Sequence, residues 1–372
     1  MNDSLWDFCH RTAFLVALSS ALTLSCASTG TEPRTASGTR SYRMGFSPIP
    51  PRLSIAEVLR TLDSASRHAD AALMVVDIPW ASLLADTNAA LLVRRDQLPL
   101  AQQFAQRGLP ITVQLEPANG LDRRAESAVL RSLGRSITEP AVQRAYREYV
   151  VAFDSIVRPS ALLIAVETNL IRVASPPAVY DALVAMSNAA AKQLRASGST
   201  TRLMVSVQVE TVWGRLAGAG GGIFTGVQRD RTDFPFIDML GLSSYPYLAG
   251  FSAPEEIPLD YYSRIAGGAP IPMVVTEGGW TSASVTGVTS SPEMQARYIR
   301  RQMQLADAAK LLGVFQITFT DLDLASFNVP AGSILPLFAQ LGLVDVTFRA
   351  KPALAVWDSV RAVPFVEGGR VR

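Results

Sequence analysis

The sequence has 372 residues, 48% of them hydrophobic, and its 34 basic residues nearly balance 32 acidic ones, leaving a formal net charge of +2. A chain of this length and apolar content can bury a large core, so extensive disorder is excluded. It contains no basic block and no aromatic-interleaved basic stripe, which argues against a nucleic-acid partner. The length allows one large α/β domain or two smaller ones.

The amino terminus has the pattern of an export signal followed by a tether. Arg11 precedes a short apolar run that ends at Cys26, and a polar stretch follows up to residue 40. Because the run is too short for a comfortable membrane span, we interpret residues 1–26 as a signal peptide and residues 27–40 as a flexible tether. Cys26 at the end of the run resembles a bacterial lipoprotein signal. That resemblance implies lipidation of Cys26 and a lipid anchor in the cell envelope, in the periplasm or at the outer membrane.

Two features of this leader depart from the lipoprotein pattern. Thr23 stands where a lipobox usually has Leu, and the segment before Arg11 carries Asp3 and Asp7 rather than a basic cluster. The alternatives are an ordinary cleaved signal, which would give a secreted protein, and a buried amino-terminal helix. Export is the favoured prediction.

Cysteine, histidine and lysine are too scarce for several kinds of site. The only cysteines, Cys9 and Cys26, lie in the leader, so the mature domain can form no internal disulfide. The only histidines, His10 and His68, exclude a histidine-based zinc site, a Ser-His-Asp triad and a Cys-His pair within the domain. No lysine follows a predicted strand, which argues against Schiff-base chemistry.

From about residue 41 the sequence alternates short apolar runs with amphipathic stretches, the pattern of βα units around a parallel sheet. Eight runs have the length and composition of strands, at residues 42–46, 72–76, 111–115, 161–166, 203–209, 239–244, 273–276 and 314–319. Eight units favour a single-domain (β/α)8 TIM barrel over an open doubly wound sheet, because such a barrel typically takes about 250 residues or more. We predict the barrel over residues 41–363 and a C-terminal tail over residues 364–372.

Boundary signals support helices between these strands. Ser54 and Glu57 form a capping box, in which each side chain can satisfy the other's free backbone amide. Ser291 followed by Pro292 predicts the start of a helix that runs to Gly313.

Two glutamates follow predicted strands directly. Glu167 comes after the fourth strand, and Glu277 comes between the seventh strand and the turn residues Gly278 and Gly279. In a (β/α)8 barrel the carboxyl ends of the strands form one mouth, where the chemistry occurs. Glycoside hydrolysis uses a pair of carboxyl groups, one protonated and one ionised. For either glutamate alone the alternative is a salt bridge or a solvated loop charge, but the pair predicts catalysis.

Side chains suited to a sugar ligand also follow the predicted strands. A sugar site needs flat apolar surfaces and a few convergent polar groups. Our candidates for substrate binding are Trp280, Tyr245, Tyr247, Trp80, Asn169, Gln208 and Asp77, with Trp213 as a further aromatic. For the aromatic residues the alternative is packing at the barrel rim.

Carboxylates at the strand ends permit a second interpretation. Asp77, Glu116, Asp321 and Asp323 offer the oxygen ligands that calcium or magnesium prefers. Loop caps and partners for sugar hydroxyls are the preferred interpretation of these residues, so we predict no metal and no organic cofactor.

Three segments resemble one clan of glycoside hydrolases. They are AVETN at residues 165–169, DMLGLSSYPY at residues 238–247 and VVTEGGW at residues 274–280. Segments of this kind are similar to those of the (β/α)8 glycoside hydrolases whose catalytic glutamates lie on strands four and seven. Within that clan the segment around the sixth strand looks most like the arabinogalactan endo-β-1,4-galactanase family. The resemblance spans residues 41 to 360.

The resemblance implies a role for each matched residue. Glu167 would be the acid/base and Glu277 the nucleophile, with Tyr245 near the nucleophile and Trp280 as a sugar platform. The implied protein is a retaining hydrolase of a β-linked polysaccharide or oligosaccharide, galactan-like in the nearest family. We expect a monomer whose partner is its carbohydrate substrate.

Two positions depart from the clan. Val166 stands where an Asn usually bonds the sugar 2-hydroxyl, and the eighth strand ends near Phe319 rather than a Trp. Gln208 or Asn169 could supply the missing hydrogen bond, which strengthens in the transition state. The departures keep open a different class of protein, a non-catalytic cell-surface carbohydrate-binding barrel. An unrelated barrel enzyme also stays open, because a fold alone does not give a function.

Overall fold

The computed structural model describes residues 38–367 except residues 86, 217, 220 and 268–269. The predicted signal peptide, Cys26 and most of the predicted tether lie outside the described residues. Within the described part of the chain, no helix is both long enough and apolar enough to cross a membrane.

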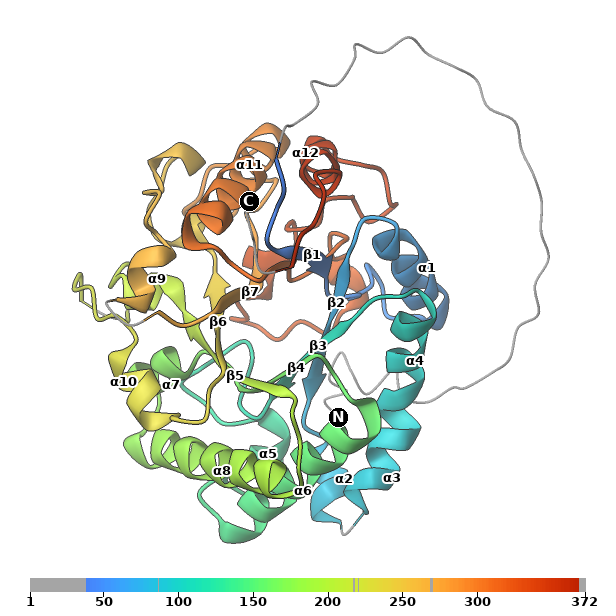
Figure 1. Ribbon diagram of the computed structural model, residues 1–372, viewed down its shortest axis with the longest axis vertical. Helices are drawn as coiled ribbons and strands as arrows, with labels where there is room; N and C mark the ends of the chain where they lie inside the picture. Colours follow the sequence, from blue (N-terminus) through green and yellow to red (C-terminus); the bar gives the residue numbers. More distant parts are fainter. Residues whose placement is uncertain (1–37, 86, 217, 220, 268–269, 368–372) are drawn as a thin grey trace, which may run out of the picture.

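Eight parallel strands close into a barrel in sequence order, with the first strand paired to the last (Figure 1). This confirms the predicted single-domain (β/α)8 barrel. The strands are β1 (Arg43–Phe46), β2 (Ala71–Asp77), β3 (Ile111–Glu116), β4 (Ala161–Ala165), β5 (Arg202–Gln208), β6 (Met239–Ser244), β7 (Met273–Gly278) and β8 (Gly313–Gln316).

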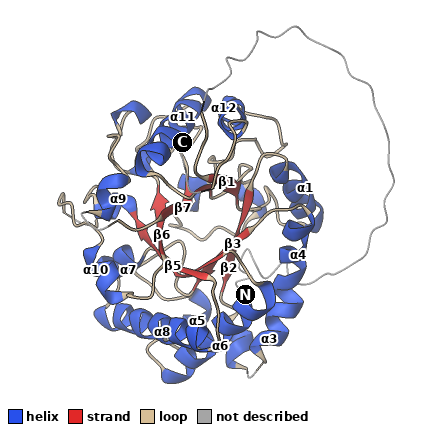
Figure 2. Ribbon diagram, in the orientation of Figure 1, coloured by secondary structure: helices blue, strands red, loops and turns tan. Residues whose placement is uncertain are grey.

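Helices surround the ring of strands (Figure 2). The longer ones are α1 (Ile55–Ser66), α4 (Leu98–Gln106), α6 (Pro140–Val157), α8 (Pro177–Ala196), α11 (Pro292–Ala309) and α12 (Pro352–Arg361). The shorter ones are α2 (Trp80–Leu84), α3 (Ala89–Leu92), α5 (Ala128–Ser132), α7 (Thr168–Ala174), α9 (Val209–Val212) and α10 (Gln228–Asp233). A π-helical turn, η1 (Val93–Gln97), joins α3 to α4.

Short 3-10 turns complete the outer layer. They are η2 (Pro246–Leu248), η3 (Pro254–Glu256), η4 (Ser263–Ala266), η5 (Leu324–Ser326) and η6 (Leu335–Phe338). Between β6 and β7 the described residues contain only such turns, so the regular strand-helix alternation is interrupted there.

The two predicted helix starts are correct in part. Ser54 caps α1 by accepting a hydrogen bond from the Glu57 amide, but the Glu57 carboxylate faces Arg52, 3.8 Å away, instead of completing the box. Ser291 caps α11 as predicted. That helix ends at Ala309, before the predicted Gly313, because Lys310 adopts a left-handed conformation with φ of 51°.

The two ends of the described part of the chain meet beside the barrel. Arg40 pairs with Phe365 in a parallel bridge, and its guanidinium donates to the carbonyls of Tyr42 at 2.6 Å and Val363 at 3.0 Å. Arg40 also forms an ion pair with Asp70 at 2.7 Å. The folded unit therefore includes the end of the predicted tether and the start of the predicted C-terminal tail.

Apolar side chains fill the barrel interior. Leu73, Leu163, Met204, Val274 and Phe315 belong to this inner cluster and are buried. A larger apolar layer lies between the sheet and the helices. Burial on both faces explains why the strands appear in the sequence as continuous apolar runs.

Two register shifts lie near the carboxyl ends of the strands that carry the two glutamates. In β4 the shift falls between Leu163 and Ala165, and β7 contains one extra residue relative to β6. As a result Glu277, rather than Thr276, is in register with Ser243, whose side chain points into the barrel mouth. A bulge of this kind redirects a side chain, and here it turns Glu277 toward the mouth.

Candidate active site

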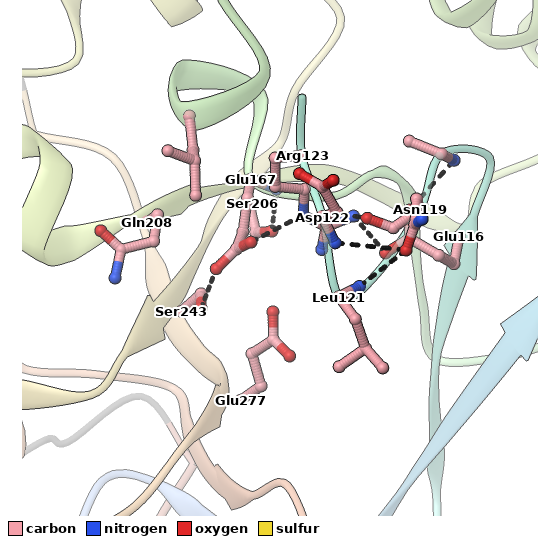
Figure 3. Close-up of polar contacts among 12 residues, drawn as sticks. Glu116, Asn119, Leu121, Asp122, Arg123, Glu167, Ser206, Gln208, Ser243 and Glu277 are labelled. Atoms are coloured by element: carbon pink, nitrogen blue, oxygen red, sulfur yellow. Dashed lines mark hydrogen bonds and ion pairs between the residues drawn. The ribbon is translucent and has the colours of Figure 1, made fainter. Parts of the chain in front are cut away.

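The structure brings Glu167 and Glu277 together at the mouth of the barrel. Glu167 follows β4 and Glu277 lies in β7, and each is only 8% exposed. Figure 3 shows the Glu277 side chain pointing toward Glu167 and Ser243. The Ser243 hydroxyl donates to Glu167 Oε1 at 2.5 Å, and Ser243 is in register with Glu277 on the neighbouring strand. The contact and the register together place the two carboxyls on adjoining parts of the mouth.

The backbone at Glu167 is unusual. Its φ and ψ are both 48°, in the left-handed region that few residues other than glycine occupy. The Glu167 amide donates to Ser206 Oγ at 2.9 Å, and this bond helps to hold the turn. The preceding Val166 points into the apolar barrel interior, so it cannot contact a sugar in the mouth.

Arg123 forms a buried ion pair with Glu167 that the sequence analysis missed. Its Nε donates to Glu167 Oε2 at 2.7 Å, and a terminal nitrogen donates to Glu116 Oε2, also at 2.7 Å (Figure 3). Arg123 is 7% exposed. It lies in the long loop after β3, and no strand end or spacing marks it, so sequence reasoning had no signal to find it.

The two glutamates have different surroundings. Glu167 accepts hydrogen bonds at both carboxylate oxygens. Glu277 Oε1 has no hydrogen-bond partner among the described residues, and the Tyr245 hydroxyl lies 3.5 Å from Glu277 Oε2. Burial and then the charge of Glu167 raise the pKa of Glu277 to about 8, against the opposing effect of Arg123. These surroundings favour the protonated form of Glu277.

A fourth buried glutamate lies behind Tyr245. Glu210, just after β5, accepts hydrogen bonds from the Tyr245 amide at 3.0 Å and from the hydroxyls of Ser244 and Tyr261 at 3.1 Å each. Burial raises the pKa of Glu210 to about 7. Since its oxygens are occupied, Glu210 fixes the backbone that places Tyr245 beside Glu277.

Asn169 and Gln208 do not present free amides to the mouth. Asn169 Nδ2 donates to the Gln208 carbonyl at 2.9 Å, and Asn169 Oδ1 accepts from the Gln208 amide at 2.8 Å. The Gln208 side chain caps α9 at Thr211 and donates to Glu210. Both side chains are buried, and each amide nitrogen donates to a partner within the fold. That either residue replaces the missing clan Asn stays a prediction.

Most of the candidate aromatics pack inside the molecule. Trp280 is 1% exposed, its indole nitrogen donates to Ser290 Oγ at 3.0 Å, and its ring packs on Tyr298. Trp80 is equally buried and packs against Tyr146, and the Tyr247 hydroxyl donates to the Leu337 carbonyl. These rings offer no free face to a sugar, so the packing alternative describes them and the platform expectation does not.

The remaining candidates have mixed positions. Tyr245 lies in the site, next to Glu277. Asp77 is partly buried at the end of β2, in register with Glu116. Trp213 is partly buried and stacks on Tyr261, with ring centroids 5.2 Å apart. Phe319 is fully buried against Phe46, so it cannot stand beneath a sugar as the clan Trp does.

The carboxylates once considered for a metal site have other partners. Glu116 pairs with Arg123, Asp321 with Lys351 at 2.5 Å, and Asp323 with Arg52 at 2.8 Å. Among the described residues, no group of three or more His, Cys, Asp or Glu side chains could hold a metal ion. These contacts agree with the interpretation of the carboxylates as structural partners.

A long segment after β8 forms one side of the mouth. Its buried residues Leu322, Phe327, Leu335 and Ala339 form a small apolar cluster with residues of the loop after β1. The Phe338 ring packs on Tyr245, with centroids 4.9 Å apart. The segment thus supports the Tyr245 ring, whereas Glu210 holds the Tyr245 backbone.

Comparison with known proteins gives likeness in structure but not in sequence. No protein-family profile matches the chain, and no curated protein matches it. An exo-β-1,4-mannosidase from Opitutaceae bacterium strain TAV5 superposes with a TM-score of 0.64 at 16% identity, over 89% of this chain and 61% of that one. The present chain thus spans about three fifths of the mannosidase.

Two other solved structures have similar barrels. A GH5_18 protein from Streptomyces cattleya in complex with Manβ1-4GlcNAc gives a TM-score of 0.61 at 16% identity, over 87% of this chain and 83% of that one. A β-glucuronidase from Ruminococcus gnavus in complex with uronic deoxynojirimycin gives a TM-score of 0.55 at 14% identity, over 86% of this chain and 49% of that one. At these identities the likeness establishes the (β/α)8 fold alone. None of the three is a galactanase, so the galactanase resemblance gains no support.

Proposed function

We propose that this protein is a retaining glycoside hydrolase that acts on β-linked polysaccharides or oligosaccharides. The observation that carries the proposal is the pair of buried carboxyls, Glu167 and Glu277, which face each other at the barrel mouth in different surroundings. Glycoside hydrolysis requires one ionised and one protonated carboxyl, and unlike surroundings are what separate their protonation states.

The geometry favours retention over inversion. An inverting enzyme separates its carboxyls by about 6.5–9.5 Å to admit a water molecule, whereas a retaining enzyme keeps them about 5–5.5 Å apart. Here Ser243 donates to Glu167 and is in register with Glu277 on the neighbouring strand. That arrangement supports the closer spacing.

The structural neighbours suggest where a substrate search should begin. One is named as an exo-β-1,4-mannosidase, one was solved with Manβ1-4GlcNAc, and one is named as a β-glucuronidase. We therefore place β-1,4-mannosides first, β-glucuronides second and β-1,4-galactans third.

A second candidate function is carbohydrate binding without turnover. The observations that favour it are the ion pair between Arg123 and Glu167, which occupies one catalytic candidate, and the interior position of Val166. A barrel that lost the 2-hydroxyl contact could still bind a sugar chain at its mouth.

Activity measurements distinguish the two candidates. Purified protein is incubated with 2,4-dinitrophenyl β-glycosides of mannose, glucuronic acid, galactose and glucose, and with the matching β-1,4-linked oligosaccharides. Proton NMR of the first product identifies its anomeric configuration. The proposal expects a β-configured product from wild type and at least a 1,000-fold loss of kcat in Glu167→Gln and Glu277→Gln. The exposed Glu255, paired with Arg297 at 2.5 Å, provides the control Glu255→Gln, which should retain activity.

The contrary results are equally specific. Oligosaccharide binding by calorimetry with no turnover of any substrate would favour the binding barrel. Hydrolysis that survives Glu277→Gln would remove this carboxyl from the mechanism.

A further inference from the structure

Glu210 is fully buried in α9, directly after β5, and takes no part in the reaction proposed above. We propose that Glu210 is a positioning residue, which sets the place of the Tyr245 hydroxyl beside Glu277. The inference rests on the proposed function, because positioning affects turnover only if the site hydrolyses a glycoside.

The Glu210 carboxylate accepts hydrogen bonds at both oxygens. Oε2 accepts from the Tyr245 amide at 3.0 Å and from Gln208 Nε2 at 2.5 Å. Oε1 accepts from the hydroxyls of Ser244 and Tyr261 at 3.1 Å each. The two oxygens of a carboxylate offer about four lone pairs. Glu210 is therefore fully occupied within the fold, so it supports other residues and does not contact a substrate.

Tyr245 needs such a partner because the chain leaves the sheet at this point. The ladder between β6 and β7 ends at Ser244, one residue before Tyr245. A buried backbone amide without an acceptor is costly, and Glu210 supplies the acceptor. Since Glu210 also accepts from the Ser244 hydroxyl, it holds two consecutive residues. These contacts fix the direction in which the Tyr245 ring leaves the strand.

The Tyr245 ring ends beside Glu277. Its hydroxyl lies 3.5 Å from Glu277 Oε2, and its ring packs on Phe338. That distance is longer than an optimal hydrogen bond, so a shift of about 0.5 Å makes or breaks the contact. The contact therefore depends closely on the backbone that Glu210 holds.

Glu210 is also linked to the segment of the other catalytic candidate. Gln208, which donates to Glu210, exchanges two backbone hydrogen bonds with the Asn169 side chain, at 2.9 and 2.8 Å. Asn169 lies in the first turn of α7, two residues after Glu167. A line of hydrogen bonds thus runs behind the mouth from the Glu167 segment through Glu210 to Tyr245. All of these residues are buried, which strengthens such a network.

Two substitutions separate the reach of the Glu210 side chain from its charge. Glu210→Asp keeps the charge but is shorter by one methylene, so it withdraws the acceptor from the Tyr245 amide. Glu210→Gln keeps the length and one acceptor oxygen. That oxygen should face the Tyr245 amide, because an amide can only donate. The hydroxyls of Ser244 and Tyr261 can instead accept from the new NH2 group.

Kinetics with the 2,4-dinitrophenyl β-glycoside that wild type hydrolyses fastest test the proposal. In Glu210→Asp, kcat and kcat/KM should fall together by about 100-fold with KM nearly unchanged, because a misplaced group weakens the transition state. Glu210→Gln should stay within about tenfold of wild type, since the Tyr245 amide keeps its acceptor. An active Asp variant beside an impaired Gln variant would overturn the proposal, because charge and not reach would then matter.

A double-mutant cycle tests whether Glu210 acts through Tyr245. If it does, Glu210→Asp should change kcat by less than about threefold in a Tyr245→Phe background, where the hydroxyl is already absent. A loss of about 100-fold in both backgrounds would mean that Glu210 acts on the fold in general, and the proposal would fail.

The control for general destabilisation is Asp321→Asn. Asp321 is a buried carboxylate after β8, paired with Lys351, and its replacement should change kcat equally with and without the Tyr245 hydroxyl. Should Glu210→Asp not fold, Tyr261→Phe takes its place in the cycle, because it removes one donor to Glu210 and keeps the ring. Its smaller loss of kcat should vanish in Tyr245→Phe. A loss that persists there, or no loss at all, would contradict the proposal.

Carbon-13 NMR of protein labelled at tyrosine Cζ needs no turnover. The sequence has nine tyrosines, and Tyr245→Phe identifies the Tyr245 signal. That signal should shift in Glu277→Gln and in Glu210→Asp, and it should lie close to its wild-type position in Glu210→Gln. An unmoved Tyr245 signal in Glu210→Asp would overturn the positioning role.

The two kinds of measurement separate this inference from the proposed function. If the NMR signals follow expectation but wild type hydrolyses no glycoside, the proposed function fails while Glu210 still positions Tyr245. If wild type hydrolyses a glycoside but the effects of Glu210→Asp and Tyr245→Phe are additive, the positioning role alone fails.

Discussion

Arg123 decides the charge state of the mouth, although it lies in a loop that follows no motif. Its guanidinium joins Glu116 and Glu167, and all three side chains are buried. A sequence reader can find the two glutamates because each follows an apolar run, but pairing between a loop residue and a strand end depends on how the loop folds. The candidate catalytic residues were therefore predictable, whereas their electrostatic partner was not.

Replacing Arg123 should destabilise the protein strongly. Arg123→Gln leaves Glu116 and Glu167 buried without their cation, and breaking a buried pair in this way costs about 3–5 kcal/mol. Urea denaturation would measure the loss. The matched control is Arg124→Gln in the same loop, because Arg124 is 77% exposed and should change stability by less than about 0.5 kcal/mol. Equal effects of the two variants would contradict the buried ion pair.

The raised pKa of Glu277 predicts a pH dependence of stability. The folded protein keeps the Glu277 proton up to about pH 8, whereas the unfolded chain releases it near its ordinary value of 4.5. Between these two pH values the folded state binds more protons than the unfolded state. The stability that Glu277 contributes is therefore fully present below about pH 4.5 and is lost as the pH rises toward 8. The slope is at most about 1.4 kcal/mol per pH unit.

Urea denaturation at several pH values checks this dependence. The stability of wild type relative to Glu277→Gln should fall between pH 5 and pH 8. Wild type relative to Glu255→Gln should show no such trend, because Glu255 is exposed and its pKa is lowered by its bond to Arg297. A relative stability that rises with pH would contradict the protonated state of Glu277.

At the scale of the elements, hydrophobic runs predicted all eight strands because parallel barrel strands are buried on both faces. The register shifts in β4 and β7 were not predictable, since a bulge arises from pairing with a neighbouring strand and leaves no local mark in the sequence. The turns between β6 and β7 were also missed, because tertiary packing there replaces a helix with 3-10 turns. Helix starts marked by Ser54 and Ser291 were found, because a cap is local.

The left-handed residue after α11 yields a prediction for one element. Lys310 has φ of 51° and is exposed, so replacing it with glycine removes backbone strain. Lys310→Gly should raise the free energy of unfolding by about 0.5 kcal/mol, after the entropy that glycine adds to the unfolded chain. Thermal or urea denaturation checks the change.

Lys192 is the matched control for this substitution. It is exposed and lies within α8, four residues before the helix ends at Ala196, where glycine should lower stability by about 1 kcal/mol. A similar loss in both lysine variants would show that the conformation of Lys310 carries no strain.

At the scale of the whole molecule, Lys351 connects parts of the chain that are distant in sequence. Its ammonium donates to Asp321 after β8 at 2.5 Å, to Ser282 after β7 at 2.8 Å and to the Gly342 carbonyl at 2.9 Å. The sequence does not predict this connection, because a single lysine gives no sign of a distant partner. In the fold it joins two loops of the barrel to the start of α12.

Removing this connection should weaken the whole fold. Lys351→Met leaves Asp321 buried without its cation, so we expect a loss of about 3 kcal/mol in urea denaturation. The double variant with Asp321→Asn should recover part of that loss, because the uncompensated charge is gone. No recovery in the double variant would mean that packing of the lysine stem, rather than the ion pair, provides the stability.

The pairing of Arg40 with Phe365 determines at which end of the barrel the amino-terminal segment is attached. Arg40 leads into the amino end of β1, whereas Glu167 and Glu277 lie at the carboxyl ends of their strands, at the other end of the barrel. A lipid on Cys26, if the leader is of the lipoprotein type, would be connected to the barrel at the end opposite the mouth. Purified protein immobilised on beads through its amino end should therefore keep the activity it has in solution.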